Sequence, residues 1–190
     1  MFAAMRDLSR LLRPRSIAVV GGGAWCEQII LQCQKIKFSG HIWLVHPREI
    51  KVCGVKAVAS LAALPSAPDA VFLGVNRHLA IELMRELSLM GAGGAVCFAS
   101  GFSEAVAEDA SGADLQAALI DAAGEMPFLG PNCYGFVNAL DNALLWPDQH
   151  GCTPVETGVA ILTQSSNIAI NLTMQQRGLP IAYTIACGNM

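Results

Sequence analysis

The chain is poor in aromatic and basic residues. Aromatic residues make up 6% of its 190 residues, and 12 Lys and Arg stand against 15 Asp and Glu, which gives a formal net charge of −3. Proteins that bind nucleic acids present a basic surface and often stack bases on aromatic rings. The sequence offers neither feature, so it predicts no nucleic-acid partner.

Long apolar runs are absent as well, although 53% of the residues are hydrophobic. A helix that spans a membrane needs about 20 consecutive apolar residues. Runs such as residues 70–75 are much shorter, and residues 1–8 contain no apolar core typical of a secretory signal. The sequence therefore predicts no membrane partner and a cytoplasmic location.

The spacings that metal sites and disulfide frameworks use are also missing. The seven cysteines are odd in number and include no Cys-x-x-Cys pair, and the four histidines show no His-Glu-x-x-His motif. Reduced thiols and no metal site are predicted.

What the sequence does contain is an alternation of strand and helix patterns. Apolar runs at residues 16–20, 42–45, 70–75, 95–99 and 127–129 are typical of buried strands, and glycine-containing loops and helical periodicity lie between them. This order predicts an α/β fold with a Rossmann-like, doubly wound parallel sheet. A ligand of such a sheet lies at the carboxyl ends of the strands.

Two of the expected helices begin with capping signals. Asn76 stands at the start of a helix that we expect to run to about Met90. Ser111 and Asp114 resemble a capping pair ahead of the next helix.

The strand pattern resumes near the end of the chain. A strand at residues 159–163, a helix at 167–177 and a strand at 181–186 are too few to bury a core of their own. We therefore expect a Rossmann-like domain at 1–147. Residues 148–190 would form a connector and the incomplete N-terminal part of a second α/β domain.

The first strand runs into three glycines, Gly21-Gly22-Gly23. This run fits the first half of the dinucleotide fingerprint Gly-x-Gly-x-x-Gly, but the third glycine position is Cys26. Glycines here would let backbone amides of residues 22–25 approach a pyrophosphate at the start of the next helix. The alternative is a tight turn between strand and helix that binds no ligand.

The residues after the second strand argue against NAD. An enzyme that binds NAD usually has Asp or Glu there for the ribose hydroxyls, whereas Val45 is followed by His46-Pro47-Arg48. Hydrogen-bond donors at this place suit an additional phosphate, either on the ribose of NADP or at the 3′ position of coenzyme A. Arg48 is equally consistent with a solvated surface charge.

Five motifs then occur in an order typical of one family. They are Leu11-Leu12-x-Pro14-x-Ser16-Ile17-Ala18-Val19-Val20-Gly21, His46-Pro47-Arg48, Ser100-Gly101-Phe102-Ser103-Glu104, Leu129-Gly130-Pro131-Asn132-Cys133-x-Gly135 and Thr163-Gln164-Ser165-Ser166. From about Leu11 to Asn189 the chain resembles the CoA-binding domain of the NDP-forming (ADP-forming) acyl-CoA synthetases, which is related to the α subunit of succinyl-CoA synthetase. The resemblance implies that the second unit begins a flavodoxin-like ligase domain.

The resemblance also implies which residues bind ligands. Those expected to contact coenzyme A are Gly21, Gly22, Gly23, Ala24, Trp25, His46, Pro47, Arg48, Val75, Asn76, Phe98, Ala99, Ser100, Gly130, Pro131, Asn132 and Cys133. Those expected to face a phosphate are Gln164, Ser165 and Ser166. No catalytic residue is expected in this chain.

Some positions depart from the family pattern. The family commonly has Gly-Ala-Ser where Gly21-Gly22-Gly23 stands, and Ser-Gln-Ser-Gly where residues 163–166 stand. Ser165 and Ser166 suit a plain helix cap as well as a phosphate contact. Cys133 stands near the expected thiol end of coenzyme A, but it has no neighbouring His in the sequence, so we expect packing rather than nucleophilic chemistry.

The implied function is that of an acid–thiol ligase. Such an enzyme makes acyl-CoA, ADP and phosphate from an acid, coenzyme A and ATP, through a phosphohistidine and a magnesium-dependent ATP-grasp domain or subunit, all expected outside this chain. The chain alone would be inactive. Two alternatives are a CoA- or acyl-CoA-sensing domain fused to a protein acetyltransferase and an NADP-binding oxidoreductase fragment. The acyl group and a homo-oligomeric state stay open.

Overall fold

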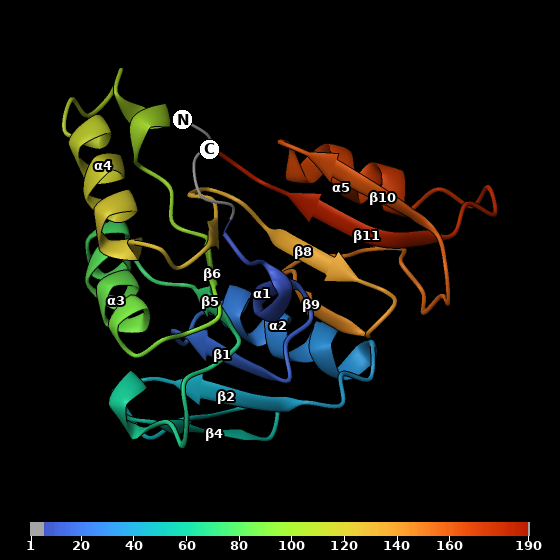
Figure 1. Cartoon of the computed structure of the whole chain (residues 1–190), viewed down its shortest axis with the longest axis horizontal. Helices are drawn as coiled ribbons and strands as arrows, with labels where there is room; N and C mark the ends of the chain where they lie inside the picture. Colours follow the sequence, from blue (N-terminus) through green and yellow to red (C-terminus); the bar gives the residue numbers. More distant parts are fainter. Residues whose placement is uncertain (1–5, 190) are drawn as a thin grey trace.

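The structure is a computed structural model that describes residues 6–189, and it contains two β-sheets (Figure 1). The first has seven strands in the order β3-β4-β2-β1-β5-β6-β7. Its strands are β1 (Ser16–Val20), β2 (His41–Val45), β3 (Lys51–Val52), β4 (Val55–Val58), β5 (Ala70–Leu73), β6 (Ala95–Cys97) and β7 (Phe128–Leu129).

Strand β1 forms the centre of the first sheet. All five of its residues are buried, and it pairs in parallel with β2 on one side and with β5 on the other. A parallel strand covered on both faces favours apolar residues, which explains the run from Ile17 to Val20, while the buried Ser16 hydroxyl accepts from the Asp69 amide at 3.1 Å. Apart from the antiparallel β3–β4 pair, the neighbouring strands of this sheet are parallel.

Helices cover both faces of the first sheet. They are α1 (Ser9–Leu12), α2 (Ala24–Lys35), α3 (Arg77–Leu89) and α4 (Gly112–Ala123). Ile17 and Val19 pack in one core cluster with residues of α2, whereas Ala18 and Val20 pack in another with residues of α3 and α4. This division follows from the two-residue period of a strand. Figure 1 shows α3 and α4 side by side on one face.

The second sheet has four strands in the order β10-β11-β8-β9. Its elements are β8 (Gly135–Asn138), β9 (Ala143–Leu145), β10 (Val159–Thr163), α5 (Ser166–Thr173) and β11 (Ile181–Ala186). The sheet packs on α2 from the side opposite the first sheet, and the Cys33 thiol donates to the carbonyl of Leu144 at 3.4 Å. The two sheets therefore share one core around α2.

The structure confirms the predicted fold class and three strands to the residue, at 16–20, 159–163 and 181–186. Four strands were not predicted: the β3–β4 pair and the β8–β9 pair. Strands β8 and β9 precede residue 147 and yet pair within the second sheet. The domain boundary at 147 stays a prediction.

One predicted helix cap is confirmed and one is wrong. The Asn76 side chain accepts hydrogen bonds from the amides of His78 and Leu79, at the start of α3. Ser111 makes no side-chain cap to α4, because its hydroxyl donates instead to Asp109 at 2.6 Å.

No helix among residues 6–189 is long and apolar enough to cross a membrane. Within the same residues, no group of three or more His, Cys, Asp or Glu side chains is placed to hold a metal ion.

Candidate functional site

The loop after β1 is built so that only glycine fits at its first position. Gly21 has a φ of +125°, and a Cβ atom there would lie 2.5 Å from the carbonyl oxygen of Gly74. The loop therefore stays close to the end of β5, and it leads directly into α2. At Gly23, by contrast, a Cβ would meet nothing within 4 Å.

Cys26 occupies the third glycine position of the fingerprint, and the structure shows how it is accommodated. Its side chain is 1% exposed and lies against Gly74, where an added Cβ would be 2.5 Å from the Cys26 sulfur. The glycine that lets α2 pack closely on the sheet thus stands on β5's loop instead of in the helix. The incomplete fingerprint does not disturb the turn.

The N-terminus of α2 is open to a ligand. Gly23 caps it in an extended conformation without a side-chain hydrogen bond. Within the described residues, no protein acceptor is found for the amides of residues 22–25. Unpaired amides at a helix start carry partial positive charge and suit an anion.

His46, at the end of β2, leans over this loop. An added Cβ on Gly22 would lie 2.7 Å from Cδ2 and 2.9 Å from Nε2 of His46. The Arg48 amide donates to Nδ1 of His46 at 3.1 Å. Nδ1 of His46 also lies 3.4 Å from the Arg48 carbonyl oxygen. The backbone of Arg48 thus orients the ring, and Nε2 lies on the side of the glycine loop.

A hollow of about 460 Å³ lies beside the loop, at the carboxyl ends of β1, β2 and β5. It is lined by Val20, Gly21, Gly22, Val45, His46, Pro47, Ala59, Ser60, Leu61, Gly74, Val75, Asn76, Leu79, Leu83 and Glu86. Six of these were expected to contact coenzyme A: Gly21, Gly22, His46, Pro47, Val75 and Asn76. Arg48 is exposed and does not line the hollow. We call it the first hollow.

A second hollow, of about 280 Å³, lies between the two sheets. It is lined by Phe98, Asn132, Cys133, Tyr134, Gln164, Ser165, Ser166 and Asn167. Ser165 is the N-cap of α5 and accepts from the Ile168 amide at 3.4 Å, while the Ser166 hydroxyl accepts from the Tyr134 amide at 3.3 Å. Ser166 thus ties the start of α5 to the segment that follows the Gly-Pro-Asn turn, whereas Ser165 caps its own helix.

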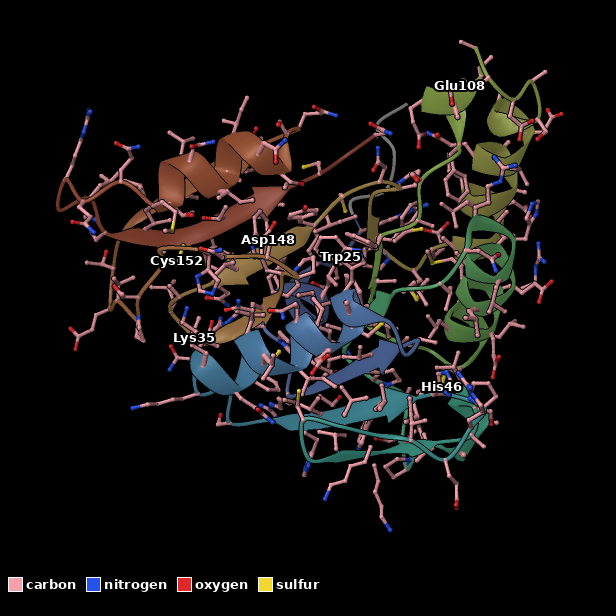
Figure 2. All side chains as sticks on the ribbon, turned by 180° about the vertical axis from the view of Figure 1, so that it is seen from behind. Trp25, Lys35, His46, Glu108, Asp148 and Cys152 are labelled. Atoms are coloured by element: carbon pink, nitrogen blue, oxygen red, sulfur yellow. The ribbon has the colours of Figure 1, made fainter. Side chains whose placement is uncertain are left out.

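Three aromatic rings connect α2 with the second hollow. The ring centroids of Trp25 and Phe98 are 5.2 Å apart, those of Trp25 and Tyr134 6.1 Å, and those of Phe98 and Tyr134 5.9 Å. We call these three residues the aromatic cluster. Figure 2 shows Trp25 near the centre of the molecule, where α2 faces the second sheet, with His46 at the far end of β2.

Cys133 is buried and unsuited to nucleophilic chemistry. Its side chain is 1% exposed, and burial raises the pKa of its thiol far above the ordinary value. A thiol must ionise to attack, so this environment keeps Cys133 inert. Its neighbour Gly130 has a φ of +102° and would place a Cβ 2.5 Å from the Cys97 carbonyl oxygen, so the turn itself requires glycine.

The remaining predicted site residues lie around the same end of the first sheet. Ala99 is buried, and its carbonyl accepts from the Asn132 amide at 2.9 Å, which fixes the turn beside β6. Ala24 and Ser100 are exposed and Pro131 is buried. Tyr134 was missed because it stands at the variable position of its motif.

A larger hollow, of about 740 Å³, lies at the opposite, amino-terminal end of β1. Its lining includes Arg10 and Arg13, which are paired with Asp69 at 2.8 Å and with Asp141 at 3.1 Å. Since ligands of such sheets bind at the carboxyl ends of strands, this hollow is not the candidate site.

The chain is similar to known proteins in both sequence and structure. A family model for a CoA binding domain matches residues 15–139. The chain is 32% identical to trans-feruloyl-CoA synthase from an unknown prokaryotic organism, over 97% of this chain and 27% of that protein. It is 30% identical to acetate–CoA ligase [ADP-forming] II of Archaeoglobus fulgidus, over 70% of this chain and 20% of that protein. The chain therefore belongs to the family of CoA binding domains.

A solved structure supports the fold of this family member. The dinucleotide forming acetyl-coenzyme A synthetase 1 of Ca. Korarchaeum cryptofilum, in complex with phosphate and ADP, is similar with a TM-score of 0.83 and 24% identity. The match covers 97% of this chain and 40% of that one. The chain thus spans well under half of this solved relative and about a quarter of the two curated ones.

Proposed function

We propose that this chain is the coenzyme A-binding part of an ADP-forming acyl-CoA synthetase. The observation that supports it most is the open N-terminus of α2, with the first hollow on one side and, across the aromatic cluster, the second hollow on the other. An elongated ligand with a pyrophosphate near its middle suits this arrangement. The family match over residues 15–139 supports the same ligand.

Coenzyme A would lie across the carboxyl ends of the strands. Its adenosine would occupy the first hollow, and its pyrophosphate would accept from the amides of residues 22–25. His46 and Arg48 would meet the phosphates from the end of β2. The pantetheine arm would then pass Trp25 and bring the thiol to the turn at 130–133.

The second hollow would bind the phosphate group that takes part in the reaction. Gln164, Ser165 and Ser166 offer an amide, two hydroxyls and the start of α5 to an anion. The whole enzyme would convert an acid, coenzyme A and ATP into acyl-CoA, ADP and phosphate. The phosphohistidine and the ATP-grasp domain or subunit, with its magnesium ion, would lie outside the 190 residues.

Calorimetric titration with coenzyme A, NAD and NADP tests the ligand. We expect coenzyme A to bind more tightly than either dinucleotide, and 3′-dephospho-CoA to bind more weakly than coenzyme A because it lacks the phosphate near His46 and Arg48. Arg48→Ala should weaken coenzyme A binding, and Arg85→Ala, at an exposed position on α3, is its control and should not. Tighter binding of NAD or NADP would contradict the proposal.

Two neighbouring substitutions test the role of the Gly-Pro-Asn turn. Asn132→Ala removes an exposed amide that lines the second hollow, and we expect it to weaken coenzyme A binding more than Cys133→Ser does. The buried thiol contributes packing rather than chemistry. An equal or larger loss with Cys133→Ser, in a variant with unchanged stability, would point to a functional thiol.

A further inference from the structure

Aromatic residues are scarce in this chain, yet they gather at one place. Five of the twelve Phe, Tyr and Trp residues form one connected group: the aromatic cluster, together with Phe72 and Trp146. Phe72 and Trp146 are fully buried, with ring centroids 5.4 Å from Phe98 and 5.5 Å from Tyr134. They hold the outer rings from beneath, so the aromatic cluster is a fixed surface.

The outer rings are available to a ligand. Trp25 is 45% exposed, and Phe98 and Tyr134 are partly exposed. The ring planes are tilted by 49°, 47° and 36° to one another rather than stacked, so no ring of the three covers the full face of another. An indole that is half exposed at the start of α2 adds little to the stability of the fold. An aromatic ligand that contacts it would gain binding free energy.

Polar side chains lie beside the aromatic cluster in the second hollow. Phe98 and Tyr134 share the second hollow with Asn132, Gln164, Ser165 and Ser166. A molecule that fits has a polar or anionic group at one end and a flat apolar body at the other. The first hollow contains none of the three rings, so adenine placed there leaves the aromatic cluster uncovered.

We propose that the acyl group of this synthetase is aromatic, with its carboxyl carbon toward Ser165 and Ser166 and its ring against Trp25, Phe98 and Tyr134. This inference rests on the proposed function, because the coenzyme A thiol has to reach the turn at 130–133 for its acyl group to meet these rings.

Binding of four ligands to the 190-residue chain tests the inference: coenzyme A, acetyl-CoA, hexanoyl-CoA and cinnamoyl-CoA. We expect cinnamoyl-CoA to bind about tenfold more tightly than acetyl-CoA, since contacts between aromatic rings add to the burial of apolar area. Hexanoyl-CoA carries an apolar chain without a ring, and we expect it to fall between them. Cinnamoyl-CoA should also quench Trp25 fluorescence.

Substitutions at Trp25 give the decisive comparison. Trp25→Ala should abolish the preference for cinnamoyl-CoA over hexanoyl-CoA, whatever it does to the affinity for coenzyme A itself, while Trp25→Phe should keep most of the preference. Leu89→Ala, at a side chain that is 84% exposed on α3, is the matched control and should change neither affinity. Circular dichroism and the unfolding midpoint establish that each variant folds.

The outcomes separate this inference from the proposed function. Coenzyme A binding with no preference for cinnamoyl-CoA over hexanoyl-CoA, or a preference that survives Trp25→Ala, overturns the aromatic acyl group alone. Failure of all four ligands to bind overturns the proposed function and this inference with it.

Discussion

At the scale of single residues, two glycines of one loop carry opposite constraints. Gly21 combines a φ of +125° with a Cβ position 2.5 Å from a backbone oxygen, whereas Gly23 has free space. We expect Gly21→Ala to lower the free energy of unfolding by about 3 kcal/mol, from backbone strain and overpacking. Gly23→Ala should cost only about 0.5–1 kcal/mol, because Ala is a poorer N-cap than Gly but meets no steric obstacle there. Denaturant titration measures both, and equal losses would mean that the loop conformation differs.

His150 makes stability depend on pH. It is 7% exposed, neither ring nitrogen has a hydrogen-bond partner, and burial, helped by Lys35, lowers its pKa to about 4. Below its ordinary pKa of about 6.5 the unfolded chain binds a proton that the folded chain refuses. Stability is therefore lost as the pH falls from about 6.5 toward 4.

Between pH 7 and pH 5 this linkage should cost about 2 kcal/mol of unfolding free energy. His150→Leu should remove that dependence, and His78→Leu, at an exposed position, should keep it. Urea titrations at several pH values measure the slope. The same slope in His150→Leu as in the unchanged chain would assign it to other groups.

The glycine loop and the Gly-Pro-Asn turn could be predicted because each is a local pattern. Other site residues could not. Ser60 and Leu61 reach the first hollow from the segment after β4, and Tyr134 meets Trp25 from more than 100 positions along the chain. Gly74 likewise compensates for Cys26 across the sheet. Such contacts depend on topology, which no short window of sequence contains.

At the scale of elements, burial decided which strands the sequence revealed. β1 is buried throughout, and four of its five residues form one apolar run, Ile17 to Val20. β3 and β4 contain two and four residues, none fully buried, and give no such run. β8 is buried, but its pairing with β11 joins Gly135 to Ala186. A pairing over that separation was not predictable from either segment alone.

The two predicted helix caps allow a matched experiment. Asn76 accepts from the amides of His78 and Leu79 at 3.1 and 3.0 Å, so Asn76→Ala should cost about 1 kcal/mol of unfolding free energy. Ser111 caps no amide of α4, and Ser111→Ala should cost less than about 0.5 kcal/mol. Thermal or denaturant unfolding distinguishes them. A larger loss at Ser111 would mean that its bond to Asp109 supports the loop more than a cap supports α3.

At the scale of the whole molecule, α2 links the ligand site to the core. The unpaired amides stand at its N-terminus, and the rest of the helix packs between the first sheet and β9. The rings of Phe72 and Trp146, from the first sheet and from beside the second, close around the aromatic cluster. Both sheets therefore fix the position of Trp25, and the site depends on their being folded together.

The placement of the histidines leads to the last prediction: the 190-residue chain binds without reacting. Among the described residues none of the four histidines lines the second hollow. His150 is buried, His41 stacks on Trp43, and His46 stands at the first hollow. Incubation with labelled ATP, magnesium, coenzyme A and several carboxylic acids should yield neither phosphorylated protein nor acyl-CoA. An acid-labile phosphoprotein, or steady release of ADP, would place a catalytic centre within these residues.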